Sequence, residues 1–294
     1  MKPAPFDYVR PASLDEACTL LADDDGARLI AGGQTLVPMM AMRLAQPTRL
    51  IDVARIPGLA FVRDDGNAVA IGATTRHCVL ERDPVIRDKV PLLAAVMPWV
   101  GHAATRARGT IGGSLANADP AAEIALVAVV LGATLSYRNG AAGADLSAAE
   151  FFTGAMTTAL PAAGFLTAVR FPVWREQRIG VGFHEVSARR SDFAFVSAAA
   201  QVALDDDGAC RRLAVGIGAA TAVPLRLDSA GKALEGTRLD ESACRDAVSA
   251  AVADIEPLSD LHATADYRRR VAVTLAVRAI ADARNAAMRM DHAR

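Results

Sequence analysis

The sequence predicts an α+β protein built from two successive domains. The chain has 294 residues, which is enough for two domains of ordinary size. Hydrophobic residues make up 52% of it, many of them Ala and Val, as in chains that mix helices and strands. From about Trp174 onward, several strand-like segments are followed by several helix-like ones, a pattern typical of an α+β unit. We place the boundary near residues 173–179, which gives domains of residues 1–176 and 177–294.

The first domain opens with short apolar strands separated by helices. Ser13-Leu14-Asp15-Glu16 has the form of a capping box before apolar residues at helical spacing, so we expect a helix that ends near residues 23–26. Strands are expected over 28–31 and 50–53. Asp64-Asp65-Gly66-Asn67 is a turn sequence between two apolar runs, which predicts a hairpin over residues 61–72.

The rest of this domain is expected to alternate in the same way. Helices are predicted over 75–82 and 91–100. Pro120 begins a third helix that carries residues 121–131, because proline is favoured in the first turn of a helix. The remaining segments are a strand over 133–137, a turn-rich spacer over 140–143 and a strand over 166–172 that ends at a proline.

The second domain is expected to be an antiparallel sheet with helices. Its predicted strands span 181–186, 193–204 and 213–219, and its predicted helices span 229–234, 240–253 and 264–288. The run from Gly216 to Thr221 approaches a dinucleotide-binding fingerprint but lacks the third glycine. We interpret it as a strand of small residues.

Two diglycine turns about eighty residues apart are the most informative feature of the chain. Ala31-Gly32-Gly33-Gln34-Thr35 follows an apolar run, and Thr110-Ile111-Gly112-Gly113-Ser114 lies before the helix expected from Pro120. Glycine lets the backbone approach a ligand closely, and successive amides in such turns form a concave anion site. One such turn could be a tight corner only. Two of them, each flanked by hydroxyl side chains, predict two walls around one phosphate-bearing cofactor.

Polar residues follow the second turn and precede it. Asn117, Asp119 and Glu123 come just before or inside the first turn of the expected helix. Asp119 could cap that helix, or one of the acids could accept hydrogen bonds from cofactor hydroxyls, and both can hold for different residues. The spacing of Arg106 and Arg108 fits a surface loop, a group that neutralises a diphosphate, or a partner interface equally well.

Composition argues against several other classes of function. The formal net charge of −1 provides no cationic field for nucleic acid. The cysteines are too far apart in sequence for a metal or iron–sulfur motif, and the five histidines show no ligand spacing, so no metal site is predicted. We interpret the cysteines as reduced thiols of a cytosolic protein. They are Cys18, Cys78, Cys210 and Cys244.

Neither a secretion signal nor a membrane span is expected. The first residues, Met1 to Asp7, lack the apolar core of a signal peptide. The longest apolar stretch, residues 124–133, is too short to cross a bilayer. The protein is therefore expected in the cytoplasm.

The long motif from Gly109 to Pro120 resembles that of the FAD-binding medium subunits of molybdenum hydroxylases, which include carbon monoxide dehydrogenase and xanthine dehydrogenase-like enzymes. The resemblance covers nearly the whole chain. Further matching segments, in the same order as in that family, are Ala31 to Pro38, Leu50 to Val53, Ile71 to Thr75, Arg190 to Ala194 and Tyr267 to Arg269. Two departures are Ser191, where glycine is common, and His184-Glu185, where some relatives carry lysine.

The resemblance implies a vanillyl-alcohol-oxidase (PCMH)-type FAD-binding domain of two α/β lobes over residues 1–176. A carbon-monoxide-dehydrogenase-flavoprotein-like domain of antiparallel sheet and helices would then span 177–294. Both glycine-rich loops would hold the FAD diphosphate through backbone amides, and the two acids would lie near the ribityl chain. The implied cofactor contacts are Ala31, Gly32, Gly33, Gln34, Thr35, Leu36, Thr110, Ile111, Gly112, Gly113, Ser114, Asp119, Glu123 and Leu166.

The resemblance also implies an oxidoreductase subunit with no catalytic acid or base of its own. The substrate would be hydroxylated at a molybdenum-pterin cofactor on a large subunit. Electrons would pass through 2Fe–2S clusters on a small subunit to FAD in this chain, and then to an external acceptor. The expected assembly is a heterotrimer, dimerised into a dimer of heterotrimers. No motif specifies the organic substrate, which the large subunit would recognise, or the acceptor.

Two alternatives belong to other classes. A standalone flavin oxidase or reductase of the same fold would act on a small molecule directly and needs a proton donor over the flavin. The three tyrosines, Tyr8, Tyr137 and Tyr267, are not next to either diglycine turn. A non-enzymatic nucleotide-binding scaffold is the other alternative.

Overall fold

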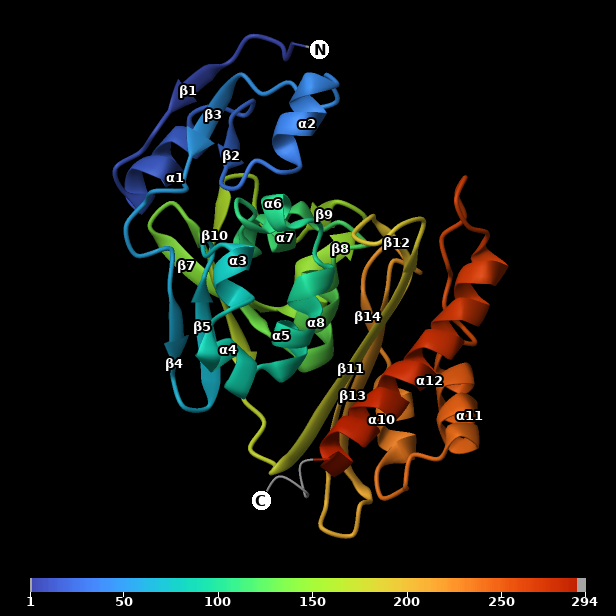
Figure 1. Cartoon of the computed structure of the whole chain (residues 1–294). Helices are drawn as coiled ribbons and strands as arrows, with labels where there is room; N and C mark the ends of the chain where they lie inside the picture. Colours follow the sequence, from blue (N-terminus) through green and yellow to red (C-terminus); the bar gives the residue numbers. More distant parts are fainter. Residues whose placement is uncertain (1, 290–294) are drawn as a thin grey trace.

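The structure, a computed structural model, describes residues 2–289. Within these residues the strands form four sheets, of three, five, four and two strands. The three-stranded and five-stranded sheets form the two lobes of the first domain, and the four-stranded sheet belongs to the C-terminal domain (Figure 1). This arrangement confirms the expected α+β fold with its two N-terminal α/β lobes.

The N-terminal lobe is a parallel sheet in the order β1-β3-β2. Its helix α1 (Leu14–Ala22) begins where it was predicted, because the Ser13 hydroxyl accepts a hydrogen bond from the Glu16 amide. The Glu16 carboxylate accepts from the amide of Ala12, so the expected capping box is only half formed. A second helix, α2 (Leu36–Ala41), was not expected and follows the first diglycine turn directly. The strands are β1 (Asp7–Val9), β2 (Arg28–Ile30) and β3 (Arg49–Asp52).

The second lobe is an antiparallel sheet in the order β4-β5-β10-β6-β7. The hairpin predicted over residues 61–72 is confirmed as β4 and β5. Residues 140–141 of the expected turn-rich spacer form the tight turn between β6 and β7, whereas residues 142–143 already belong to β7, a strand that was not expected. The five strands are β4 (Val62–Asp64), β5 (Ala68–Gly72), β6 (Thr134–Asn139), β7 (Ala142–Ser147) and β10 (Gly164–Pro172).

Short helices cover this sheet on the side of the C-terminal domain (Figure 1). The smallest sheet pairs β8 (Phe152–Gly154) with β9 (Thr157–Thr158). A single 3₁₀ turn, residues 97–99, follows α5. The helices are α3 (His77–Leu80), α4 (Pro84–Lys89), α5 (Pro91–Val96), α6 (Ala103–Arg106), α7 (Ile111–Asn117), α8 (Glu123–Leu131) and α9 (Ala148–Phe151).

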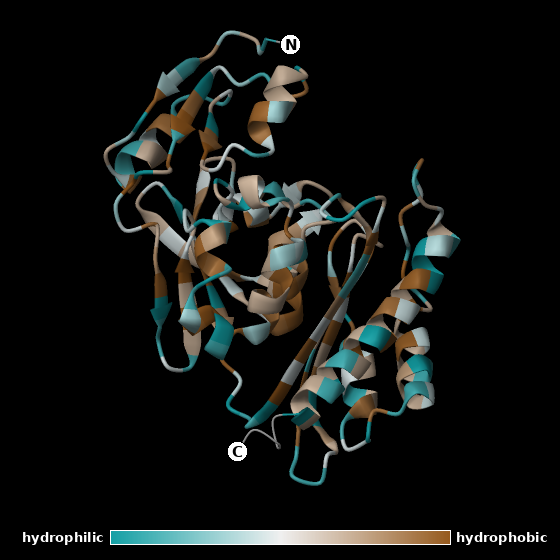
Figure 2. Cartoon of the chain, viewed as in Figure 1, coloured by the Kyte–Doolittle hydropathy of each residue, from teal (hydrophilic) through white to brown (hydrophobic). Residues whose placement is uncertain are grey.

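Helix α8 is the central element of the protein. Every residue after Glu123 in this helix is buried, and Figure 2 colours it hydrophobic over most of its length. Such a helix must be covered on all sides, and α8 packs between the second lobe and the C-terminal sheet. It begins at Glu123 and not at Pro120, because the Asp119 carboxylate accepts a hydrogen bond from the Ala121 amide and holds residues 119–121 in a turn.

The C-terminal domain is an antiparallel sheet, β11-β12-β13-β14, covered by helices as predicted. The long helix α12 (Ala265–Arg289) lies along one face of the sheet (Figure 1). Gly180 and Gly182 allow this contact, since a Cβ atom at either position would lie within 2.1 Å of a carbonyl oxygen of α12. The other elements are β11 (Arg178–Ser187), β12 (Ala194–Leu204), β13 (Cys210–Gly218), β14 (Leu225–Arg226), α10 (Asp228–Leu234) and α11 (Glu241–Ala251). The first three residues of the run from Gly216 to Thr221 lie in β13, as expected of a strand, and residues 219–221 follow its end.

Candidate functional site

Both diglycine segments line one cavity of about 630 Å³ between the two lobes of the first domain. The two walls approach each other closely, because a Cβ atom on Gly32 would lie 2.5 Å from the carbonyl oxygen of Arg108. Ile111 is the exception among the expected contacts, since its side chain is buried in the core and does not line the cavity. The expected contacts that line it are Ala31, Gly32, Gly33, Gln34, Thr35, Leu36, Thr110, Gly112, Gly113, Ser114, Asp119, Glu123 and Leu166.

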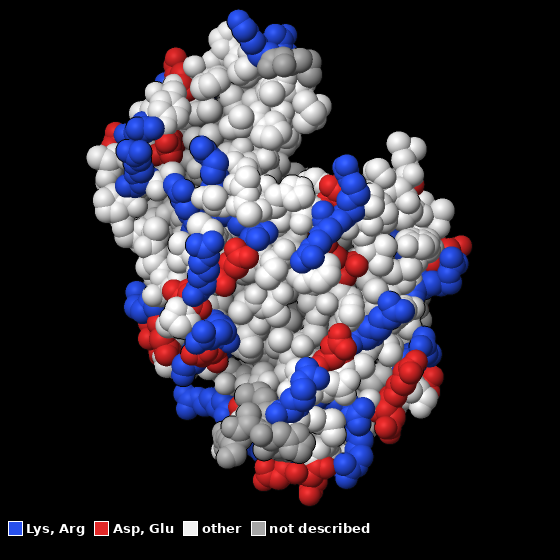
Figure 3. Space-filling view, in the orientation of Figure 1, with Lys and Arg blue, Asp and Glu red and all other residues white. Residues whose placement is uncertain are grey.

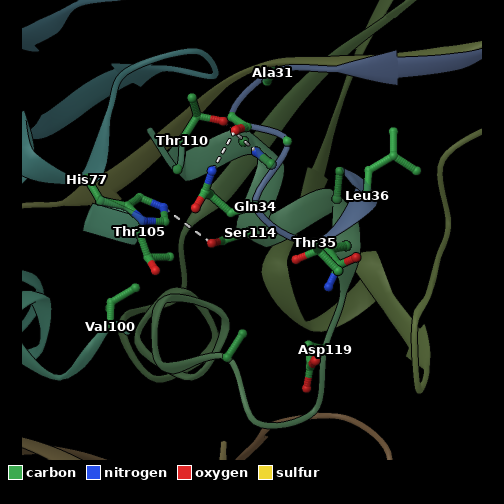
Figure 4. Close-up of a pocket in the computed structure, with 18 of the residues that line it drawn as sticks. Ala31, Gln34, Thr35, Leu36, His77, Val100, Thr105, Thr110, Ser114 and Asp119 are labelled. Carbon is green, nitrogen blue, oxygen red and sulfur yellow. Dashed lines mark hydrogen bonds between the residues drawn. The ribbon is translucent and has the colours of Figure 1, made fainter. Parts of the chain in front are cut away.

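The first diglycine segment lines this cavity and has backbone donors without acceptors among the described residues. Gly33 has a φ of 68°, and the amides of Gly33, Gln34 and Thr35 donate to no acceptor within the described residues. The Gln34 side chain folds back onto the carbonyl of Gly32, which fixes the turn (Figure 4). A left-handed residue followed by free amides forms a concave anion site. Helix α2 starts immediately afterwards and adds the positive end of its dipole.

The second diglycine segment has a different structure from the expected loop, because it forms the first turn of α7. The Thr110 hydroxyl caps this helix by accepting from the Gly113 amide at 3.2 Å. The amides of Ile111 and Gly112 are already used, by the carbonyls of Thr75 and Ala73. The Ser114 amide donates to the carbonyl of Thr110, so all four amides of residues 111–114 are used. The expectation that this segment holds a diphosphate through backbone amides is therefore wrong, and the wall offers hydroxyls beside Gly113 instead. A Cβ on Gly112 would clash with Ala73 at 2.6 Å, so this glycine serves close packing.

His77 lies in the cavity beside the second wall and had no sequence signal. Its Nε2 is 3.2 Å from the Ser114 hydroxyl, and its side chain is buried (Figure 4). Burial lowers the pKa of His77 to about 4, so the imidazole is neutral at physiological pH. It adds no charge to the cavity and positions Ser114. Val100, His102 and Thr105, from the segment around α6, also line the cavity without a sequence signal.

The buried imidazole predicts a loss of stability in acid. Between about pH 6.5 and pH 4 the unfolded chain binds a proton at His77 that the folded chain resists, so the free energy of unfolding falls as pH falls. The expected contribution is about 2–3 kcal/mol at pH 4.5 relative to pH 7. Urea unfolding at both pH values would measure it. His77→Gln keeps a donor for Ser114 and does not titrate, so its loss should be smaller by this amount; equal losses in both proteins would contradict the assignment.

Two acids at the start of α8 have different roles. Asp119 lines the cavity while its carboxylate accepts from the Ala121 amide, so it shapes the loop. Glu123 also lines the cavity, and burial, together with the nearby Glu185 and Asp119, raises its pKa to about 8. Burial also raises the pKa of Glu185 to about 7, and neither of its carboxylate oxygens has a hydrogen-bond partner among residues 2–289. At neutral pH the Glu123 carboxyl is mostly protonated and can donate a hydrogen bond.

Arg106 and Arg108, the two arginines before the second turn, have different surroundings. Arg106 makes a bidentate ion pair with Glu81 and donates to the carbonyl of Gly101, so it has a structural role. Arg108 lines another cavity, of about 550 Å³, to which the first diglycine turn also contributes. Neither arginine lines the main cavity.

The C-terminal domain closes the main cavity with residues Ser191 to Phe193, from the connection between β11 and β12. The Phe193 side chain is 72% exposed, which is unusual for phenylalanine. Ser191 has a left-handed φ of 68°, the conformation that glycine adopts most easily. The position where the sequence departs from its relatives therefore keeps a backbone shape suited to glycine.

Other kinds of site find no support within residues 2–289. Acidic, histidine and cysteine side chains do not gather there in groups of three or more that could hold a metal ion. His292 lies outside these residues. Lys and Arg are interspersed with Asp and Glu on the face seen in Figure 3. In the described part of the chain, none of the helices has the length and apolar character needed to span a bilayer.

Comparisons with known proteins agree on one family. Residues 4–174 match the model of the FAD-binding domain in molybdopterin dehydrogenase, and residues 182–283 match the CO dehydrogenase flavoprotein C-terminal domain. The chain is 35% identical over 284 residues to the 6-hydroxypseudooxynicotine dehydrogenase complex subunit alpha of Paenarthrobacter nicotinovorans, covering 96% of each chain. It is 34% identical to the carbon monoxide dehydrogenase medium chain of Afipia carboxidovorans, covering 95% of this chain and 97% of that one. Its structure matches a chain of quinoline 2-oxidoreductase from Pseudomonas putida with a TM-score of 0.92 and 36% identity, over 98% and 100% of the two chains.

Proposed function

The chain belongs to the family of FAD-binding medium subunits of molybdenum hydroxylase-type dehydrogenases, and on this basis we propose that it is the electron-transfer subunit of a heterotrimeric molybdenum hydroxylase. The proposed partners are a large subunit with a molybdenum-pterin cofactor and a small subunit with 2Fe–2S clusters. Two heterotrimers would pair, and the complex would work in the cytoplasm. We also propose that residues 1–176 form the FAD-binding domain and residues 177–294 the C-terminal domain.

The observation that carries the proposal is the set of three amides, from Gly33 to Thr35, that have no acceptor within the described residues and belong to residues lining a cavity of about 630 Å³. They fit a diphosphate, because successive free amides at the start of a helix favour an anion. The second wall adds Gly113 and the hydroxyls of Thr110 and Ser114, and Glu123 offers a neutral carboxyl to the sugar-alcohol chain. The chain's own residues would therefore bind and orient the dinucleotide and carry no acid–base chemistry on the organic substrate.

FAD, when bound, would supply the redox chemistry, accepting electrons that arrive from the small subunit and giving them to an external acceptor. The protein contributes a fixed site and partial exclusion of water by the segment from Ser191 to Phe193. A standalone oxidase is the weaker candidate, because none of the three tyrosines lines the main cavity within the described residues.

Because of Glu123, FAD binding is expected to depend on pH. FAD is expected to bind the form with a protonated Glu123, because an ionised carboxylate would repel the dinucleotide from a buried position. With a pKa of about 8, the FAD dissociation constant should rise about tenfold between pH 7 and pH 9. Fluorescence titration of the full-length chain over this range would measure it.

Two variants control this measurement. Glu123→Gln cannot ionise, so its FAD dissociation constant should stay flat with pH. Glu185→Gln removes a charge that raises the pKa of Glu123, so the rise should set in at a lower pH without disappearing. A wild-type dissociation constant that does not change up to pH 9 would refute the role given to Glu123.

The assembly is tested by purification from the native cell under gentle conditions, followed by metal and flavin analysis. We expect a yellow complex in which this chain carries FAD and two companion chains carry molybdenum and iron. A chain that oxidises a small molecule alone, without companions or metals, would favour the standalone enzyme. A colourless chain that binds no added FAD would favour the scaffold.

A further inference from the structure

Helix α12 carries a buried arginine that the proposed function does not use. Arg268 is only 4% exposed, although a buried guanidinium is destabilising unless its donors are satisfied. It donates to the carbonyl oxygens of Phe195 at 2.5 Å and Ala219 at 2.8 Å, and to the carboxylate of Asp260 at 2.6 Å. One side chain in the C-terminal domain thus joins three segments that are far apart in sequence.

The first of these segments leads directly into the wall of the main cavity. Phe195 lies two residues after Phe193, the last of the three residues with which the C-terminal domain lines the cavity. Its aromatic ring also stacks on that of His262, at 5.6 Å between ring centroids. The carbonyl that Arg268 holds is therefore at the base of the segment that covers the cavity.

The second segment connects Arg268 to the opposite wall. The Ala219 amide donates to the carbonyl of Pro120 at 2.8 Å, and Pro120 lies between Asp119 and Ala121, which both line the cavity. Ala219 has a left-handed φ of 59°, an uncommon conformation for alanine, and its carbonyl accepts from Arg268. Through Ala219, Arg268 reaches the loop that leads into α8.

The third segment fixes the guanidinium itself. Asp260 accepts hydrogen bonds from the amides of His262 and Ala263 as well as from Arg268. Nη1 and Nη2 of the planar guanidinium bond to a carboxylate and two carbonyls in one rigid geometry, which a lysine ammonium on a flexible stem does not reproduce. The buried Nε has no hydrogen-bond partner within the described residues. The geometry of this contact is therefore specific to arginine.

We propose that Arg268 is a positioning residue for the cofactor site, setting the distance between the covering segment, residues 191–193, and the loop of residues 119–123. This inference rests on the proposed function, since it assumes that the cavity holds FAD. Arg268 itself does not line the cavity. Its loss should change how FAD is held, in addition to any effect on folding.

The test compares Arg268→Lys with Arg269→Lys in the full-length chain. Arg269 is the matched control, because it lies next to Arg268 on α12 and also donates to two carbonyls, those of Val252 and Ala253, which do not line the cavity. For each protein we would measure the FAD dissociation constant, the visible circular dichroism of bound FAD, and urea unfolding of the FAD-free chain. Arg268→Lys should raise the dissociation constant about tenfold and alter the dichroism, whereas Arg269→Lys should change neither.

The outcomes separate the two claims. If wild-type chain binds no FAD, the proposed function fails and this inference fails with it. If wild-type binds FAD and Arg268→Lys binds it equally well with the same dichroism, Arg268 is a structural residue only and the inference alone is overturned. If Arg268→Lys does not fold, Asp260→Asn replaces it. It keeps an oxygen acceptor without the charge and should weaken FAD binding about threefold; unchanged binding would again overturn the inference.

Discussion

Replacing Gly32 with alanine is expected to weaken FAD binding about a hundredfold. The new Cβ would lie 2.5 Å from the carbonyl oxygen of Arg108 and 2.8 Å from Cα of Gly109. Both are backbone atoms, so no side-chain rotation relieves the contact and the two walls must separate. Separation moves the free amides of residues 33–35 away from the diphosphate. Loss of two hydrogen bonds to a charged group, each contributing about 1.5 kcal/mol, accounts for this factor.

Fluorescence titration of FAD into the full-length variant would measure this effect. Gly143→Ala is the matched control, because its Cβ would meet its nearest atoms at 3.7 Å, an ordinary contact, on strand β7. Far-ultraviolet circular dichroism of both FAD-free variants would show that each is folded. A Gly32→Ala dissociation constant close to that of the control would mean that the walls need not touch for FAD to bind.

Gly182→Ala should destabilise the C-terminal domain by about 3 kcal/mol or more. A Cβ at this position would lie 2.1 Å from the carbonyl oxygen of Ala279, deep under α12. Sheet and helix backbones pack directly on each other here, so the helix must move as a unit. Because α12 also carries Arg268, FAD binding should weaken in the same variant.

The midpoint of urea unfolding, followed by circular dichroism, would measure this loss. Gly154→Ala gives the comparison, since the nearest atom to its Cβ would be 3.8 Å away, and we expect a change within about 0.5 kcal/mol. If the free energy of unfolding of Gly182→Ala also changed by no more than about 0.5 kcal/mol, α12 would be able to move away from β11 at little cost in stability.

Most strands and long helices could be predicted from the sequence because their patterns are local. The helices at the two diglycine turns could not, since glycine disfavours helix and the signal points to a loop. The start of α7 depends on the rest of the lobe: the Ile111 amide bonds to the carbonyl of Thr75, and Thr110 pairs with Arg76 across a β-bridge. These contacts join residues more than thirty positions apart, which no local pattern contains.

Among the residues that line the cavity, too, those in local motifs could be predicted and those placed by distant contacts could not. Residues 31–36, 110–114, 119 and 123 were predicted because each of the two segments that contain them has a recognisable motif, and all of them except Ile111 line the cavity. His77 was missed, since its place beside Ser114 arises only when α3 packs against α7. Arg268 belongs to the segment from Tyr267 to Arg269, which resembles the family, but its role depends on the carbonyls of Phe195 and Ala219, which only the folded chain brings together.

A crystal structure of the full-length chain with FAD would test the central claim most directly. The account predicts one dinucleotide in the main cavity, with diphosphate oxygens within hydrogen-bond distance of the amides of residues 33–35 and with Gly113 on the opposite side of the same diphosphate. A dinucleotide bound elsewhere, or one that touches only one of the two glycine pairs, would contradict it.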